Sequence, residues 1–168
     1  MIKKVLLAIA LICPMLLSAQ TLKIGLVDFD AVLQAMPETT AAQNQVKEVS
    51  DKYEAEYKKL GEEMNRLVTE YQNMSEDELP AIKERKTREL SDYQQKIQQF
   101  EQNAMNDINK MQSDLMGPIQ QKIIQAVESV GREGNFSLIQ MYAPQLTLYH
   151  AAPVEDITAA VKAKLGVK

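Results

Sequence analysis

The chain has 168 residues, of which 45% are hydrophobic, 25% are charged and only 5% are aromatic. This length allows one domain, or one small domain with an appendage, and the apolar content excludes wholesale disorder. Six glycines and six prolines supply few turns, which excludes an all-β sandwich and favours long helices. The single cysteine excludes a disulfide framework and a cysteine-based zinc site. The single histidine, His150, excludes histidine-rich metal sites.

The N-terminal segment has the pattern of a secretory signal peptide. Two lysines precede an apolar run over residues 5–17, which is too short to span a bilayer comfortably, and small residues follow it. We therefore expect residues 1–19 to be removed by cleavage between Ala19 and Gln20. Cys13 follows an isoleucine where a lipobox needs a small residue, so we expect no lipid anchor.

Processing changes the composition of what remains. Without residues 1–19 the chain has about 149 residues, no cysteine, and 17 basic against 23 acidic side chains, a net charge of −6. Such a chain needs no oxidative folding. Its remaining apolar runs are all shorter than a membrane-spanning helix requires, so we expect a soluble exported protein.

The first folded segment predicts one strand and one short helix. Residues 23–29 (KIGLVDF) are mostly apolar and include β-branched side chains, which favours a buried strand. Asp30 can cap a helix of about one turn over residues 31–35, and the following Met36-Pro37 pair ends it.

Residues 38–117 predict two long helices that pair as a hairpin. Only one glycine, Gly61, and one proline, Pro80, interrupt this segment before Gly117. Apolar residues recur at spacings of seven and of three or four, which places them on one helix face, as in a coiled-coil seam. This predicted seam comprises Val46, Tyr53, Tyr57, Leu60, Met64, Leu67, Tyr71 and Met74, then Leu90, Tyr93, Ile97, Phe100, Ala104, Ile108, Met111 and Leu115.

The turn between the two helices is predicted from a capping pattern. Residues 75–78 (SEDE) form a capping box that would start the second helix, with Pro80 in its first turn. Helices joined by a short turn fold back antiparallel, which brings Pro37 level with Pro118. We therefore expect a backbone break at the same height on both sides of the hairpin. The candidate hinges are Gly61, Gly117 and Pro118.

Residues 118–168 return to a globular composition. The second helix continues to about Gly131 or Gly134. Residues 136–141 and 145–149 predict two strands, and residues 153–165 predict a short amphipathic helix closed by Gly166.

The predicted fold class is α+β, with a long antiparallel helical hairpin on a small β-sheet body. The body comprises residues 20–37 and 118–168, and the hairpin arm comprises residues 38–117. Three short strands bury too little apolar surface to be comfortable alone, so we expect a homo-oligomer whose bodies share one sheet. The residues expected to form this oligomer body are Ile24, Leu26, Val27, Leu138, Ile139, Leu146 and Leu148.

The arm carries all of the net charge. Residues 38–117 hold 11 basic and 17 acidic side chains, whereas the body segments hold six of each. An acidic arm argues against a nucleic-acid partner, which would need a basic stripe. The sequence offers no catalytic constellation, metal-ligand cluster or phosphate loop, so we expect neither an enzyme nor a bound cofactor.

Several features of the arm remain open to two interpretations. The heptad residues are interpreted as the helix–helix seam. Alternatively, apolar residues that do not take part in this contact could form an open apolar wall. Five of the seven mature methionines lie in the arm, where they could fill gaps or provide an adaptable binding surface. A basic cluster near residues 83–88 is either a solvated, balanced face or a contact for an anion such as a lipid headgroup.

The chain resembles the Skp/OmpH family of periplasmic chaperones over essentially the whole mature sequence. The resemblance is carried by residues 23–28 (KIGLVD), residues 29–34 (FDAVLQ), the long charged hairpin, and the closing residues 156–161 (DITAAV). It implies a homotrimer with a small β-barrel-like body and three helical hairpins around a cavity. Well-known members are strongly basic, whereas this chain is acidic, so no lipopolysaccharide site is carried over onto any residue.

The resemblance also implies a function, an ATP-independent periplasmic holdase that binds unfolded outer-membrane proteins in the cavity. Membrane contact would be peripheral at most. The side chains expected to bind these clients are Tyr57, Met64, Tyr93, Met105 and Met111. The alternative is an exported structural or adaptor coiled coil that binds one folded envelope partner.

Overall fold

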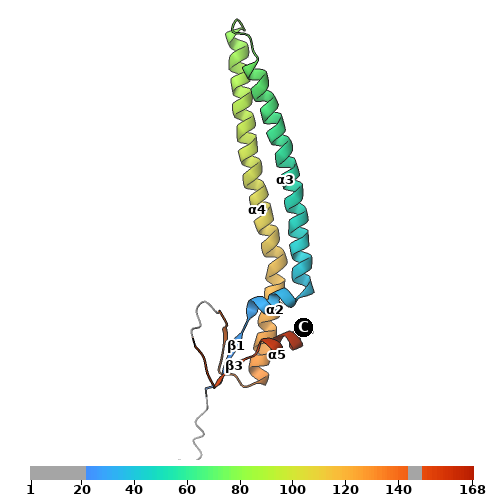
Figure 1. The fold of residues 1–168 in the computed structure, drawn as a ribbon, viewed down its shortest axis with the longest axis vertical. Helices are drawn as coiled ribbons and strands as arrows, with labels where there is room; N and C mark the ends of the chain where they lie inside the picture. The colour runs from blue at the N-terminus through green and yellow to red at the C-terminus, as the bar shows by residue number, and fades with distance from the viewer. Residues whose placement is uncertain (1–21, 144–148) are drawn as a thin grey trace, which may run out of the picture. The chain divides into compact units, whose positions relative to one another are not determined.

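The computed structural model describes residues 22–143 and 149–168 (Figure 1). The elements in chain order are β1 (Ile24–Val27), α2 (Phe29–Ala35), α3 (Pro37–Gln72), α4 (Pro80–Glu133), β2 (Leu138–Met141), β3 (Val154–Asp156) and α5 (Thr158–Leu165). This confirms an α+β fold with a long helical hairpin and a small sheet. The predicted signal peptide, with Ala19 and Gln20, lies outside the described residues.

The chain divides into two compact units. The hairpin unit spans Asp30–Ile124, and the sheet unit combines the described residues that precede Asp30 with those of Gln125–Gly166. The described helices include none that is both long enough and apolar enough to cross a membrane.

The sheet unit has a three-stranded parallel sheet in the order β2-β1-β3. Ile24 of β1 faces Leu138 of β2 on one side and Val154 of β3 on the other. Buried side chains of β1, Leu26 and Val27, and of α5, Val161, contribute to its core. Gly25 lets β1 pass close to β2, because an added Cβ would lie 3.1 Å from the Ile139 side chain, a tight contact.

The third strand is not the one expected from the sequence. Residues 153–165 were predicted as one helix, but Val154–Asp156 pairs with β1 and α5 begins only at Thr158. The Ile157 N–H donates to the Leu26 carbonyl at 2.8 Å, so the sheet ladder continues where a helix was expected. Of the predicted strand at residues 145–149, Leu146 and Leu148 lie outside the described residues and Tyr149 is not in a strand.

Both ends of α5 have clear physical causes. Gly166 adopts a left-handed φ of 72° just after the helix, which confirms the predicted C-terminal stop. At the other end Asp156 Oδ1 accepts hydrogen bonds from the Thr158 N–H at 2.9 Å and hydroxyl at 2.6 Å. The Thr158 Oγ1 in turn accepts a bond from the Asp28 N–H, which ties α5 to the end of β1.

Asp156 should make the sheet unit sensitive to acid. The hydrogen bonds from the Thr158 hydroxyl and then its N–H lower the pKa of Asp156 below its ordinary value of 3.8. A lowered pKa stabilises the folded state above the ordinary value, and this contribution is lost as the pH falls through the folded value. We expect Asp156→Ala to cost about 1 kcal/mol at pH 7, the size of a lost helix cap.

The measurement is urea unfolding of both proteins from pH 7 down to pH 2. The difference in unfolding free energy between wild type and Asp156→Ala should be largest above about pH 5 and should shrink as the pH falls through the lowered pKa. Glu155→Ala, one residue earlier and also exposed, is the control for a general charge effect, and it removes only an exposed ion pair with Lys23. A difference that is constant with pH, or as large in the control, would contradict the prediction.

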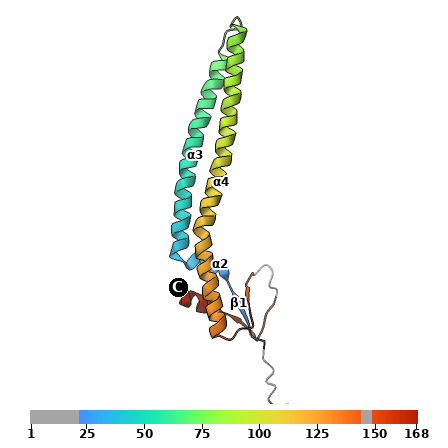
Figure 2. The same cartoon turned by 180° about the vertical axis from the view of Figure 1, so that it is seen from behind.

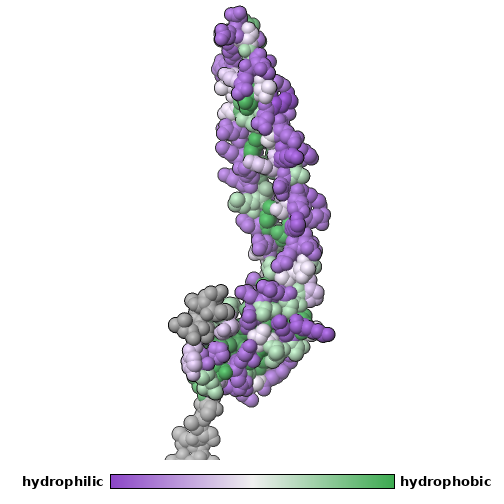
Figure 3. All heavy atoms as spheres, viewed as in Figure 1, coloured by the Kyte–Doolittle hydropathy of each residue, from purple (hydrophilic) through white to green (hydrophobic). Residues whose placement is uncertain are grey.

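In the hairpin unit, α3 and α4 run side by side and antiparallel, as both ribbon views show (Figures 1 and 2). Leu60, Leu67 and Ala104 are buried between them. The predicted coiled-coil pairing is therefore confirmed for these positions. Along the face shown in Figure 3, apolar residues form a broken line between hydrophilic flanks.

Two details of the predicted hairpin are wrong. Residues 75–79 form a turn, and α4 begins at Pro80. The Ser75 hydroxyl oxygen accepts the Asp77 N–H at 3.3 Å, so it closes a turn and does not cap the helix. Pro80 suits the first helical position because its missing N–H has no intrahelical partner there.

The predicted break at Gly117–Pro118 is also wrong, because α4 continues through both residues to Glu133. A proline inside a helix removes one backbone hydrogen bond and costs about 3 kcal/mol. The buried side chains of Ile119 and Ile123, in the next two turns, favour keeping the helix intact despite this cost. The proposed hinge roles of Gly61, Gly117 and Pro118 stay predictions.

Candidate functional site

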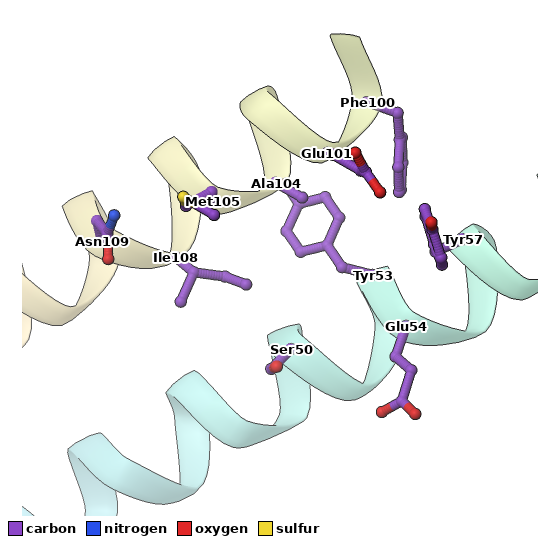
Figure 4. Close-up of a pocket in the computed structure, with 10 residues that line it drawn as sticks. All are labelled: Ser50, Tyr53, Glu54, Tyr57, Phe100, Glu101, Ala104, Met105, Ile108 and Asn109. Atoms are coloured by element: carbon purple, nitrogen blue, oxygen red, sulfur yellow. The ribbon is translucent and has the colours of Figure 1, made fainter. Parts of the chain in front are cut away.

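The hairpin unit has an open groove of about 570 Å³ between α3 and α4 (Figure 4). This volume is in the range of sites that bind small ligands or short side-chain clusters. Its apolar lining consists of Tyr53, Tyr57, Phe100, Ala104, Met105 and Ile108. Its polar lining consists of Ser50, Glu54, Glu101 and Asn109.

The aromatic side chains form the floor of the groove. The rings of Tyr53 and Phe100 meet edge to face, with centroids 5.7 Å apart and planes at 64°. Tyr57 lies one turn further along α3, and its ring stands near that of Phe100 (Figure 4). Tyr57 is 44% exposed and Met105 is 66% exposed, so large apolar surfaces face the solvent here.

Two tyrosine hydroxyls connect the helices to carboxylates. Tyr53 Oη donates to Asp107 Oδ2 at 2.7 Å, and this bond raises the pKa of Tyr53. A hydrogen bond to the Glu101 carboxylate likewise raises the pKa of Tyr57. Each phenol therefore bonds across the hairpin, from α3 to a carboxylate of α4.

The carboxylates around the groove lie outside the ion pairs of the described hairpin. Within the described residues, Glu54, Glu101 and Asp107 form no ion pair. Lys47, which interacts electrostatically with Glu54, is already bonded to Asp51 at 2.8 Å. The groove therefore combines an aromatic floor with a negative rim that forms no ion pair within the described residues.

The basic cluster near the hairpin tip is different, because two of its four cations, Lys86 and Arg88, form ion pairs. Lys86 pairs with Glu70 at 3.2 Å and with Glu89 at 2.9 Å, and Arg88 pairs with Glu84 at 2.5 Å. These contacts favour the interpretation of a solvated, balanced face over that of an anion site.

The five expected client-binding residues are not gathered in one place. Tyr57 and Met105 both line the groove. Tyr93 lies in a separate hollow of mixed charge near the tip, beside Arg85, Asp92 and Lys96. Met64 and Met111 are half-buried and line neither hollow.

Four of the apolar groove residues are not among those predicted from the sequence to bind clients. Tyr53, Phe100, Ala104 and Ile108 were assigned to the seam, where their spacing placed them. The available signal was the phase shift in the second helix after Ala104, because a changed phase moves side chains out of the seam. The rim carboxylates Glu54 and Glu101 had no distinguishing signal among 17 acidic residues of the arm.

The expected oligomer-body residues divide by exposure. Leu26 and Val27 are buried within the chain, and Ile24 and Ile139 are half-buried. Leu138 is 52% exposed, and its neighbour Met141 on the same edge strand is 57% exposed. The described strands leave the outer edges of β2 and β3 without a partner strand.

The described residues contain no group of three or more histidine, cysteine, aspartate or glutamate side chains that could hold a metal ion. The family model described as Outer membrane protein (OmpH-like) matches residues 23–165 of the chain. A comparison with curated proteins found no match.

Proposed function

The chain belongs to the OmpH-like family, and from this premise we propose that it is an ATP-independent holdase for unfolded outer-membrane proteins. Proteins of this family are periplasmic chaperones of outer-membrane proteins and are not enzymes. The signal-peptide pattern of residues 1–19 supports export to the same compartment.

The observation that carries the proposal is the exposed aromatic groove of the hairpin. A holdase must bind apolar segments of many sequences, weakly and without a fixed shape. Tyr57 and Met105 offer such contacts, because an amphipathic ring and a flexible thioether tolerate different partners. An open groove also lets an extended chain enter and leave from the side.

The functional unit we propose is a homotrimer. Among the described strands the outer edge of β2 has no partner, and this edge and the exposed side chains of Leu138 and Met141 are suited to pairing with a second copy. Three copies would present three grooves to one client, so several weak contacts would together give a high overall affinity. A client held in this way would be prevented from pairing its strand edges with other chains.

The test is aggregation of an unfolded outer-membrane barrel protein diluted from urea, followed by light scattering. We expect the mature protein to suppress scattering at about one trimer per client without ATP. Sedimentation should show a trimer at micromolar concentration. Unchanged scattering would contradict the holdase proposal. Stable binding of one folded envelope protein, without binding of unfolded clients, would favour an adaptor.

A further inference from the structure

We propose that the hairpin groove selects segments of unfolded chains in which arginine or lysine residues alternate with apolar residues. This inference rests on the proposed holdase function and names the class of segment that it prefers. It follows from two properties of one surface, an apolar floor and a negative rim (Figure 4).

The floor supplies contacts for apolar side chains and also for cations. Tyr53, Tyr57 and Phe100 come from facing helices, and Figure 4 shows their rings gathered between them. Arginine and lysine bind to the faces of such rings by cation–π contact. Their methylene stems can also cover the exposed side chain of Met105 while the charged group reaches the rim.

The rim supplies negative charge that no described ion pair neutralises, and its cationic contact, from Lys47 to Glu54, comes from a lysine already paired with Asp51. Glu54 and Glu101 line the groove. Asp107 accepts a hydrogen bond from the hydroxyl of Tyr53, which is part of the groove floor. A carboxylate accepts about four hydrogen bonds, and the tyrosine hydroxyls occupy only part of this capacity at Glu101 and Asp107. Lys58 and Lys110 follow lining residues in sequence but are not part of the lining.

The hollow near the hairpin tip differs from the groove in its charge and serves as a comparison. It also contains a tyrosine, Tyr93, but its lining has Arg85, Arg88 and Lys96 together with Glu89 and Asp92. Cations and anions there largely offset each other. Charge complementarity therefore singles out the groove for basic segments and makes acidic segments poor ligands.

The test measures binding of three fluorescent peptides to the whole mature protein by anisotropy. The peptides share one alternating aromatic and aliphatic framework, and they carry arginine, glutamine or glutamate at the intervening positions. Each exposed carboxylate–cation contact changes an affinity by up to about fivefold. We expect the arginine peptide to bind about five- to tenfold more tightly than the glutamine peptide, and the glutamate peptide most weakly. The preference should shrink as salt is raised to about 0.5 M.

The variant that locates the effect is Glu54→Gln with Glu101→Gln, which keeps the shape of both side chains. We expect it to lose most of the preference for arginine. The matched control is Glu62→Gln with Glu76→Gln, which removes the same charge from exposed hairpin positions outside the groove lining and should keep the preference. An equal loss in both variants would show that only net charge acts, and would overturn the inference.

Other outcomes separate the inference from the holdase proposal. If aggregation is suppressed but the three peptides bind equally, the inference fails and the holdase proposal stands. If neither suppression nor binding occurs, both fail. If the groove is covered by a second copy of the chain, peptides will not bind while aggregation is still suppressed, and that result also overturns the inference.

Discussion

Replacing Val161 with aspartate is expected to unfold the sheet unit. Val161 is wholly buried, and it lies on α5, which packs against β1. A carboxylate at this position would be buried without a partner, a change that costs about 4 kcal/mol or more. A small three-stranded unit has a small free energy of unfolding, so the loss caused by this substitution should exceed it.

The measurement is thermal unfolding followed by circular dichroism, with sedimentation to report the oligomer. Ala159→Asp is the matched control, because it adds the same charge to the same helix at an exposed position. We expect the control to unfold near the wild-type temperature and Val161→Asp to lose its folded sheet and the proposed trimer. Equal behaviour of the two variants would show that the position of Val161 in the fold is wrong.

The hairpin could be predicted from sequence because periodicity is a local signal. Leu60 and Leu67 are seven residues apart, and both are buried in the structure, as that spacing requires. The end of α5 was equally predictable, because Gly166 readily adopts the left-handed backbone that closes a helix.

The third strand could not be predicted in this way. Val154–Asp156 is only three residues long, and two of them are acidic, which gives no strand pattern. It becomes a strand because β1 offers an unpaired edge, a tertiary feature that is not visible in the local sequence. The same limit explains the false break at Pro118, where the local preference of proline is outweighed by burial of Ile119 and Ile123.

The groove was only partly predictable for a geometric reason. A helix with 3.6 residues per turn drifts by about 20° per heptad against a 3.5-residue repeat. Tyr53 and Tyr57 are one turn apart, yet Tyr53 meets Phe100 in the seam while Tyr57 is exposed. Sequence spacing places both on one face but does not decide which of them leaves the seam.

The location of the free charge was also beyond the sequence. Composition gives residues 38–117 a net charge of −6. It does not show which carboxylates of the hairpin lack an ion pair. That depends on which pairs meet across the helices, as Lys86 does with Glu70. Some acidic residues near the tip are neutralised by ion pairs, whereas Glu54 and Glu101 form none within the described residues. Negative charge of the hairpin therefore remains at the groove.

The second large effect is expected from Tyr57→Ser combined with Met105→Ser. Both side chains are exposed and line the groove, so the fold should tolerate their loss while the apolar contact surface shrinks. Removing about 40 Å² of apolar contact per groove weakens binding by about 1 kcal/mol, roughly fivefold. In the proposed trimer three grooves act on one client, so the combined loss of affinity should approach about 100-fold.

The measurement compares the concentration needed to halve aggregation of an unfolded barrel protein by wild type, by the double variant and by a control. Tyr71→Ser is that control, because Tyr71 is an exposed tyrosine of α3 that does not line the groove. Its activity should stay near wild type, and the helical circular dichroism of all three proteins should agree. A loss that is equal for Tyr71→Ser would show that clients bind along the whole hairpin, because then no single groove would carry the contact.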